Sequence, residues 1–166
     1  MSNTPTDELA TPTASEQDLA FMDLALAEAH AATTHGDVPI GAAVVVAGEL
    51  VSAAHNEREL REDPTAHAEV LALRAAAAAL GTWRVLDSVL YVTLEPCAMC
   101  AGAVVLARVP QLVFGAPDPK AGACGSVLDV TGEQRLNHRP TVRGGVRAQE
   151  SARLLASFFA DRRHPR

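Results

Sequence analysis

Short apolar runs rich in β-branched residues mark the strand-sized segments of the chain. Residues 40–47 and 50–54 form two such runs on either side of Gly48-Glu49, and this pattern predicts a β-hairpin with the glycine at its turn. Two further runs of strand length lie at 89–94 and 111–115. The chain therefore contains at least four expected strands.

Segments with helical spacing of apolar residues lie before, between and after these runs. The capping sequence Ser15-Glu16-Gln17-Asp18 predicts the start of a first helix that ends near Gly36. Helices that cross over between strands imply parallel pairing, so we expect a three-layer α/β/α domain with a mixed central sheet of about five strands. Further helices are expected from Pro64-Thr65 to about Leu80 with Gly81 as the stop, at 98–108, and near 151–160.

Length and composition fit one ordinary domain. The chain has 166 residues, of which 48% are hydrophobic, and the segment 15–163 is long enough for a single core. Residues 1–14 are rich in Thr, Pro, Ser and Ala and are expected to form a disordered tail. No apolar run can span a bilayer, which excludes a membrane protein. The chain has three cysteines and its N-terminus does not look like a secretory signal, so we expect a cytoplasmic protein.

The charge of the chain is unevenly distributed. Its net charge of −6 argues at first against a nucleic-acid partner. From residue 133 onward, however, eight arginines stand against three acids, and several of them lie in or beside the expected C-terminal helix. This basic cluster is either a solvated helix face or a phosphate-binding edge.

Two expected helices carry metal-binding residue types near their starts. His67 lies near the start of the second helix, and Cys97 and Cys100 lie at the start of the third. The positive end of a helix stabilises thiolates, the form that binds metal. Three ligands predict a catalytic zinc with a free fourth position, because structural zinc sites are usually closed by four protein ligands. Cys124 could close the site, although such a loop cysteine is more often a small filler.

Glu69 follows His67 by two positions and could reach a water molecule on the metal. Zinc hydrolysis requires a carboxylate that carries protons between water and the leaving group. The alternative is an ordinary first-turn acid that complements the helix dipole. The combination of His-x-Glu with Pro-Cys-x-x-Cys, each near a helix start, favours the catalytic interpretation.

The motifs His67-Ala68-Glu69 and Pro96-Cys97-Ala98-Met99-Cys100 resemble those of the zinc-dependent cytidine and adenosine deaminases. With Val113-Phe114-Gly115-Ala116 and Asn137-His138-Arg139, the chain is most similar to the bacterial tRNA-specific adenosine deaminases. The resemblance implies a cytidine-deaminase-like fold and one zinc ion per subunit, with water or hydroxide in the fourth position. It also implies hydrolytic conversion of adenosine to inosine at the wobble position of a tRNA anticodon stem-loop, by a homodimer.

The resemblance also implies a role for each matching residue. His67, Cys97 and Cys100 would bind zinc and Glu69 would be the proton shuttle. Pro117 and Pro119 stand where the family pattern has Arg and Ala, which changes the expected RNA contacts of that loop. The residues implied in substrate binding are Asn56, Val38, Ala68, Asp118, Phe159 and Arg162.

Two other functions share parts of this pattern. A guanine, cytosine or nucleoside deaminase would carry the same zinc motif and act on a free small molecule. A structural zinc module or a non-catalytic RNA-binding partner would need no proton shuttle. The arginine-rich C-terminus favours RNA over a free base, and the intact Glu69 with only three ligands disfavours the non-catalytic module.

Overall fold

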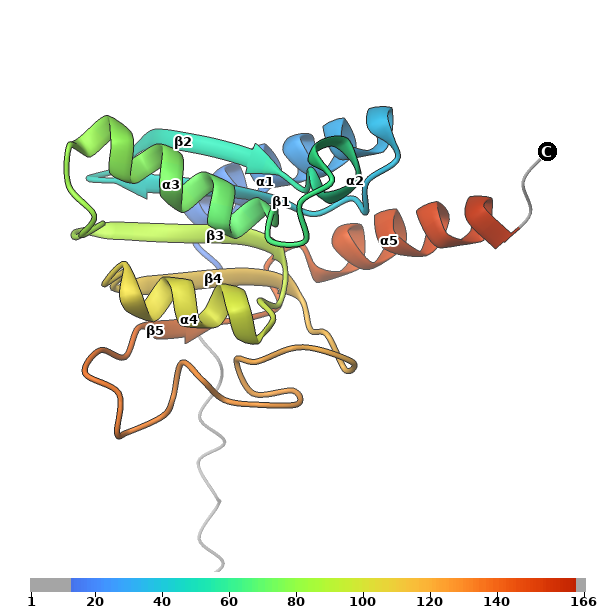
Figure 1. The fold of residues 1–166 in the computed structure, drawn as a ribbon. Helices are drawn as coiled ribbons and strands as arrows, with labels where there is room; N and C mark the ends of the chain where they lie inside the picture. The colour runs from blue at the N-terminus through green and yellow to red at the C-terminus, as the bar shows by residue number, and fades with distance from the viewer. Residues whose placement is uncertain (1–12, 164–166) are drawn as a thin grey trace, which may run out of the picture.

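The computed structural model describes residues 13–163, which build layers of helices around one five-stranded sheet (Figure 1). All but the last two residues of the expected tail, and Arg166 of the basic cluster, lie outside this range. Within the described residues, no helix is long and apolar enough to cross a membrane. The helices are α1 (Glu16–Ala32), α2 (Arg58–Arg61), α3 (Ala68–Leu80), α4 (Ala98–Leu106) and α5 (Ala148–Arg163), with a 3-10 turn at Thr33–His35; the strands are β1 (Gly41–Val46), β2 (Glu49–His55), β3 (Ser88–Leu94), β4 (Gln111–Ala116) and β5 (Thr141–Arg143).

The sheet has the order β2-β1-β3-β4-β5 and is mixed. β1 pairs antiparallel with β2 through the expected hairpin and antiparallel with β3. β3 pairs parallel with β4, and β4 pairs parallel with β5. The prediction of a mixed sheet with parallel pairing in its later part is therefore confirmed.

Alternation along the strands divides the core between the two faces of the sheet. Val44, Leu90 and Leu112 point to one face, where they pack with α3 and α4. Their neighbours Tyr91 and Val113 point to the other face, which α1 and α5 cover. Side chains that alternate along a strand point to opposite faces, so a strand buried on both faces reads as a continuous apolar run. Figure 1 shows α3 and α4 on the near side of the sheet and α1 on the far side.

Two short elements were not expected. β5 has only three residues and two of them are exposed, so its sequence carries no apolar alternation. α2 has four residues and no buried side chain, so no apolar stripe marks it. Both elements are fixed by tertiary contacts, which a local pattern does not report.

The second helix begins later than expected. Asp63 accepts hydrogen bonds from the backbone N–H of Thr65 at 2.8 Å and from its hydroxyl at 2.7 Å, which forms a turn in place of the first helical residues. α3 therefore begins at Ala68, and His67 is its N-cap residue in an extended conformation. α5 extends beyond the expected 151–160. Its full length was not expected because only Ser151 of its residues is buried, so the helix has a weak apolar pattern in the sequence.

The topology gathers several loops at one edge of the sheet. β2, β3 and β4 run in the same direction, since β2 and β3 are both antiparallel to β1 and β4 is parallel to β3. Their carboxyl ends therefore meet at the edge where β1 begins. At Gly41 an added Cβ would lie 1.9 Å from the carbonyl oxygen of Ala25, so only glycine lets α1 cross the start of β1 so closely.

Candidate metal centre

His67, Cys97 and Cys100 form a compact cluster at this edge of the sheet. Their ligand atoms all lie within 4.8 Å of one another. The Nδ1 atom of His67 lies 3.7 Å from Sγ of Cys97 and 3.5 Å from Sγ of Cys100. A tetrahedral site with bonds of about 2.3 Å to sulfur and about 2.1 Å to nitrogen separates such atoms by about 3.6 Å. The cluster can therefore hold a metal ion without rearrangement of these three side chains.

Two helices direct their N-termini at this cluster. His67 is the N-cap residue of α3 and Cys97 is the N-cap residue of α4, and both have extended backbone angles. Within residues 13–163, neither side chain accepts a capping hydrogen bond from its own helix. Both side chains turn toward the cluster instead, where the positive helix ends stabilise thiolate.

The thiols of the cluster ionise unequally. Hydrogen bonds from Cys100 and then from His67 lower the pKa of Cys97 to about 3. The same bond to Cys97, together with burial, raises the pKa of Cys100, and the bond to Cys97 raises the pKa of His67. A metal ion that binds here must displace the remaining protons from Cys100 and His67, which couples binding to proton release.

Glu69 lies beside the cluster in the first turn of α3 and is only 4% exposed. Burial raises the pKa of its carboxyl group, while its own backbone N–H and His67 act in the opposite direction. Residues two apart within a helix point to different sides of it. His67 is the N-cap residue with an extended backbone, so this rule does not apply to His67 and Glu69, and both side chains can reach the cluster. Glu69 is thus a buried acid in contact with a candidate metal centre.

Asn56, which follows β2, is held against the start of α3. Its side-chain oxygen accepts a hydrogen bond of 2.9 Å from the backbone N–H of Ala68. That bond fixes the orientation of the amide and leaves its NH₂ group as the part that can donate. The Ala68 side chain is fully buried in the core, so Ala68 supports Asn56 through its backbone. Val38 is half-buried just before β1, at the same edge of the sheet.

Two buried carboxylates at this edge were missed by the sequence analysis. Asp37 accepts hydrogen bonds from the backbone N–H groups of Glu59 at 2.9 Å and Leu60 at 3.2 Å, and so joins the entry of β1 to α2. Burial would raise the pKa of Asp37, but these bonds and His35 outweigh it and hold the pKa below its usual range. The second is Glu95. For both acids the sequence offers one sign of burial, which is that each lies directly beside an apolar run: Asp37 precedes 38–40 and Glu95 follows 89–94.

Glu95 organises the loop that follows β4. The backbone N–H of Asp118 donates to Glu95 at 2.9 Å, and the Asp118 carboxylate accepts from the backbone N–H of Lys120 at 2.9 Å. Burial would raise the pKa of Glu95, yet hydrogen bonds from Ser126, Asp118 and Cys124 hold it below its usual range. The Asp118 side chain, which the resemblance implied in substrate binding, is engaged in its own turn.

Several C-terminal arginines bind within the chain. Arg143 donates to Asp18 at 2.6 Å, and Arg147 forms two bonds of 2.9 Å with Asp23. These two pairs attach the C-terminal segment to the acidic first helix. They remove two members from the basic cluster that the sequence suggested.

The end of α5 is also attached to the body of the protein. Arg162 donates to the carbonyl oxygen of Gly36 and lies 4.6 Å from the ring centre of Phe158. The adjacent Phe159 is 45% exposed, and Arg163 is exposed. Phe159 and Arg163 are therefore the better placed members of this segment for a contact with a partner.

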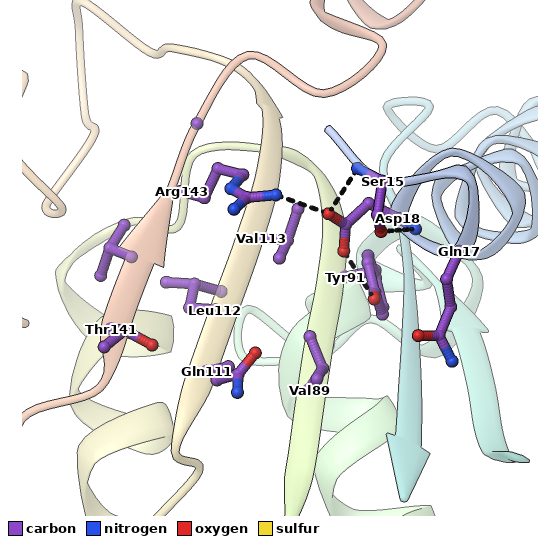
Figure 2. A pocket seen from close by; sticks show the side chains of 12 residues that line it. Ser15, Gln17, Asp18, Val89, Tyr91, Gln111, Leu112, Val113, Thr141 and Arg143 are labelled. Atoms are coloured by element: carbon purple, nitrogen blue, oxygen red, sulfur yellow. Dashed lines mark hydrogen bonds and ion pairs between the residues drawn. The ribbon is translucent and has the colours of Figure 1, made fainter. Parts of the chain in front are cut away.

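A separate hollow opens on the face of the sheet that carries Tyr91 and Val113 (Figure 2). Asp18 lies within it, where it accepts hydrogen bonds from Tyr91 at 3.0 Å and from Arg143. Ser15 and Asp18 complete a reciprocal capping box at the start of α1. This network joins α1 to β3 and β5, and the residues of the metal cluster do not line the hollow.

Comparisons with known proteins agree with the fold and the motifs. The profile of the MafB19-like deaminase family matches residues 16–163. A tRNA-specific adenosine deaminase of Bacillus subtilis is 49% identical over 147 residues, which cover 89% of this chain and 91% of that protein. The chain belongs to the tRNA-specific adenosine deaminase family. A relative of the same name from Agrobacterium fabrum is 43% identical, and the match covers 86% of this chain and 94% of that protein.

Solved structures of deaminases share this fold. A chain from a study of A-to-I editing by tRNA:A34 deaminases superimposes with a TM-score of 0.80 at 43% identity, over 82% of this chain and 99% of that one. A guanine deaminase from Nitrosomonas europaea gives a TM-score of 0.72 at 30% identity, over 89% and 86% of the two chains. The cytidine-deaminase-like fold that the motifs implied is thereby confirmed for this member of the family.

Replacement of a cluster cysteine should abolish metal retention. Cys97→Ser is expected to reduce the metal content of the purified protein from one ion per chain to less than about a tenth of that, because two ligands cannot hold the ion through purification. Elemental analysis of the protein measures this ratio. The matched control is Cys124→Ser, since Cys124 lies outside the cluster and should leave the metal content unchanged. Full metal content in Cys97→Ser would contradict the assignment.

Proposed function

We propose that this chain is a zinc-dependent enzyme that converts adenosine to inosine, with release of ammonia, at the wobble position of a tRNA anticodon. The observation that carries the proposal is the contact of the buried Glu69 with a cluster of His67, Cys97 and Cys100. The names of the relatives from Bacillus subtilis and Agrobacterium fabrum support the same substrate.

The donor set fits zinc. Two thiolates and one imidazole at these separations suit a tetrahedral ion, and three protein ligands leave one position for water. Within the described part of the chain, the cluster consists of His67, Cys97 and Cys100. Cys124 is not a member of it and so does not close the fourth position. When bound, zinc supplies Lewis acidity that lowers the pKa of water to about 7.

The side chains around the cluster divide the remaining work. Glu69 takes a proton from the attacking water and passes it to the purine ring while the water oxygen forms a bond to C6. It then passes the second proton of that water to the C6 amino group, and the C–N bond breaks to release ammonia. Its burial removes competing water from this transfer. The NH₂ group of Asn56 donates to an acceptor nitrogen of the base, since its oxygen is already bound to Ala68. Val38 lies at the same edge and forms part of the pocket wall.

The guanine deaminase alternative is less well supported. The match to that enzyme is 30% identical, whereas the match to the Bacillus subtilis enzyme is 49% identical over nearly the same share of the chain. A non-catalytic zinc module would not require a buried acid in contact with three ligands. The identities favour tRNA as the substrate, and the buried acid favours catalysis.

Glu69→Gln should retain zinc and lose turnover. The amide keeps the volume of the side chain but cannot carry a proton, so kcat on an anticodon stem-loop with a wobble adenosine should fall by about 10²-fold or more. Inosine formation and zinc content are measured on the same preparation. Glu49→Gln, at an exposed carboxylate on β2, is the matched control and should retain both. Normal turnover in Glu69→Gln would refute the proposed role.

The end of α5 is proposed to contact the RNA through Arg163 and Phe159. Arg163→Gln should weaken binding and reduce the slope of log K against log salt by about 1, as expected for one lost phosphate contact. Arg162→Gln should lower the melting temperature of the protein, because it removes the bond to Gly36. Binding is followed by fluorescence anisotropy over a salt series. Arg84→Gln, in the loop at the opposite edge of the sheet, should leave the slope unchanged; an unchanged slope in Arg163→Gln would return this residue to a solvated helix face.

We also propose that the enzyme is a homodimer in the cytoplasm. Large apolar side chains are exposed on α4 and on the long loop that follows β4, and they offer a surface that a second copy could cover. They are Met99, Leu106, Leu128 and Leu136. Sedimentation equilibrium at micromolar concentration should give twice the chain mass of 17.4 kDa. A mass of one chain at that concentration would contradict the dimer.

A further inference from the structure

Glu95 lies between the end of β3 and the metal-binding motif and is only 2% exposed. Its Oε1 atom accepts hydrogen bonds from the backbone N–H groups of Cys124 at 3.0 Å and Ser126 at 3.1 Å. Its Oε2 atom accepts from the backbone N–H of Asp118 at 2.9 Å and from the Ser126 hydroxyl. One buried carboxylate thus binds three positions of the segment 117–126, which we call the β4 loop.

All four donors to Glu95 are uncharged. Within residues 13–163, no cationic side chain lies within ion-pairing distance of Glu95. A buried carboxylate in this setting depends on its hydrogen bonds, and bonds to a charged acceptor are about twice as strong as neutral ones. The charge therefore holds the three backbone N–H groups inward and gives the β4 loop one shape.

The β4 loop wraps closely around this carboxylate. At Gly122 an added Cβ would lie 2.4 Å from both Cδ and Oε2 of Glu95, so a side chain at this position would displace the loop. The backbone N–H of Ala123 donates to the carbonyl oxygen of Pro96 at 2.8 Å, one residue before the metal ligand Cys97. The loop is thus attached to the metal-binding segment at two adjacent residues.

We propose that Glu95 is a positioning residue that holds the β4 loop beside the metal centre in the shape that receives the RNA. The inference rests on the proposed function. The loop carries the exposed Lys120, and a loop fixed in one shape presents this cation without an ordering cost when RNA binds. Glu95 is not a member of the cluster and both of its carboxylate oxygens bind the β4 loop, so it should influence substrate binding far more than the chemical step.

Glu95→Gln tests this assignment with almost no change in side-chain volume. A glutamine has one acceptor oxygen and one NH₂ group, so it cannot accept all four bonds, and its NH₂ group would face backbone donors. We expect KM for the anticodon stem-loop to rise about tenfold, which corresponds to 1.4 kcal/mol. We expect kcat to stay within about threefold and zinc content to stay at the parent level, because the cluster itself is unchanged.

Hydrogen exchange supplies a second measurement that needs no substrate. In the zinc-loaded, RNA-free protein, Glu95→Gln should accelerate exchange in a peptide that covers 117–126 by at least about tenfold, with other segments unchanged. Ser126→Ala is the second variant, for use if Glu95→Gln does not fold. It removes a single hydroxyl donor to Glu95 and should show the same changes in KM and exchange, at smaller size. Glu133→Gln, the same chemical change outside this loop, is the control and should match the parent protein.

Each outcome of these measurements decides the proposal. Unchanged KM and exchange would reject it, and a fall in kcat together with loss of zinc would show that Glu95 supports the metal centre instead. Faster exchange with unchanged KM would show a structural role without influence on RNA, which also rejects it. If the unaltered enzyme forms no inosine, the proposed function fails, whereas unchanged exchange in Glu95→Gln would independently reject the hold on the loop.

Discussion

The candidate metal centre depends on two helices that begin with a candidate ligand where a capping residue would ordinarily stand. His67 and Cys97 each take the extended N-cap conformation, and each side chain turns toward the cluster instead of capping its own helix. The exposed N–H groups of both helices then favour negative charge at a single point. Asn56 satisfies one of these groups, the N–H of Ala68, and this bond brings the loop after β2 into the same site. The cluster, the buried acid and the candidate base contact are thus consequences of one arrangement.

The main features of this site could be predicted because they have local signals. The spacing of His67, Glu69, Cys97 and Cys100 predicts a donor set and a candidate proton carrier, and the apolar runs predict β1 to β4. The features that could not be predicted depend on contacts between distant segments. β5 exists because β4 offers it an edge, and α3 starts at Ala68 because Asp63 forms a turn with Thr65. Hydrophobic periodicity carries no information about either contact.

Charge is the clearest case in which composition gave an incomplete description. The excess of arginine after residue 133 suggested a continuous basic edge, but Arg143 and Arg147 are paired with acids of α1 and Arg162 is bound to the carbonyl of Gly36. A count of charges cannot distinguish an arginine that holds two distant segments of the chain together from one that meets solvent. The same holds for buried acids: neither Asp37 nor Glu95 was singled out from the sequence, and in the structure each one organises a loop beside the cluster.

The bond between Asp18 and Arg143 joins residues 125 positions apart, and the neighbouring bond to Tyr91 joins residues 73 positions apart. During synthesis the first helix leaves the ribosome long before either partner. Its capping box can form at once, because Ser15 and Asp18 are three residues apart, but its carboxylates acquire their counter-ions only when the segment after β4 has emerged. Contacts of such long sequence separation form late and slow the folding of the whole domain. The segment that begins with β5 therefore completes the electrostatics of the first helix, so that a chain interrupted after β4 would leave Asp18 and Asp23 without their arginines.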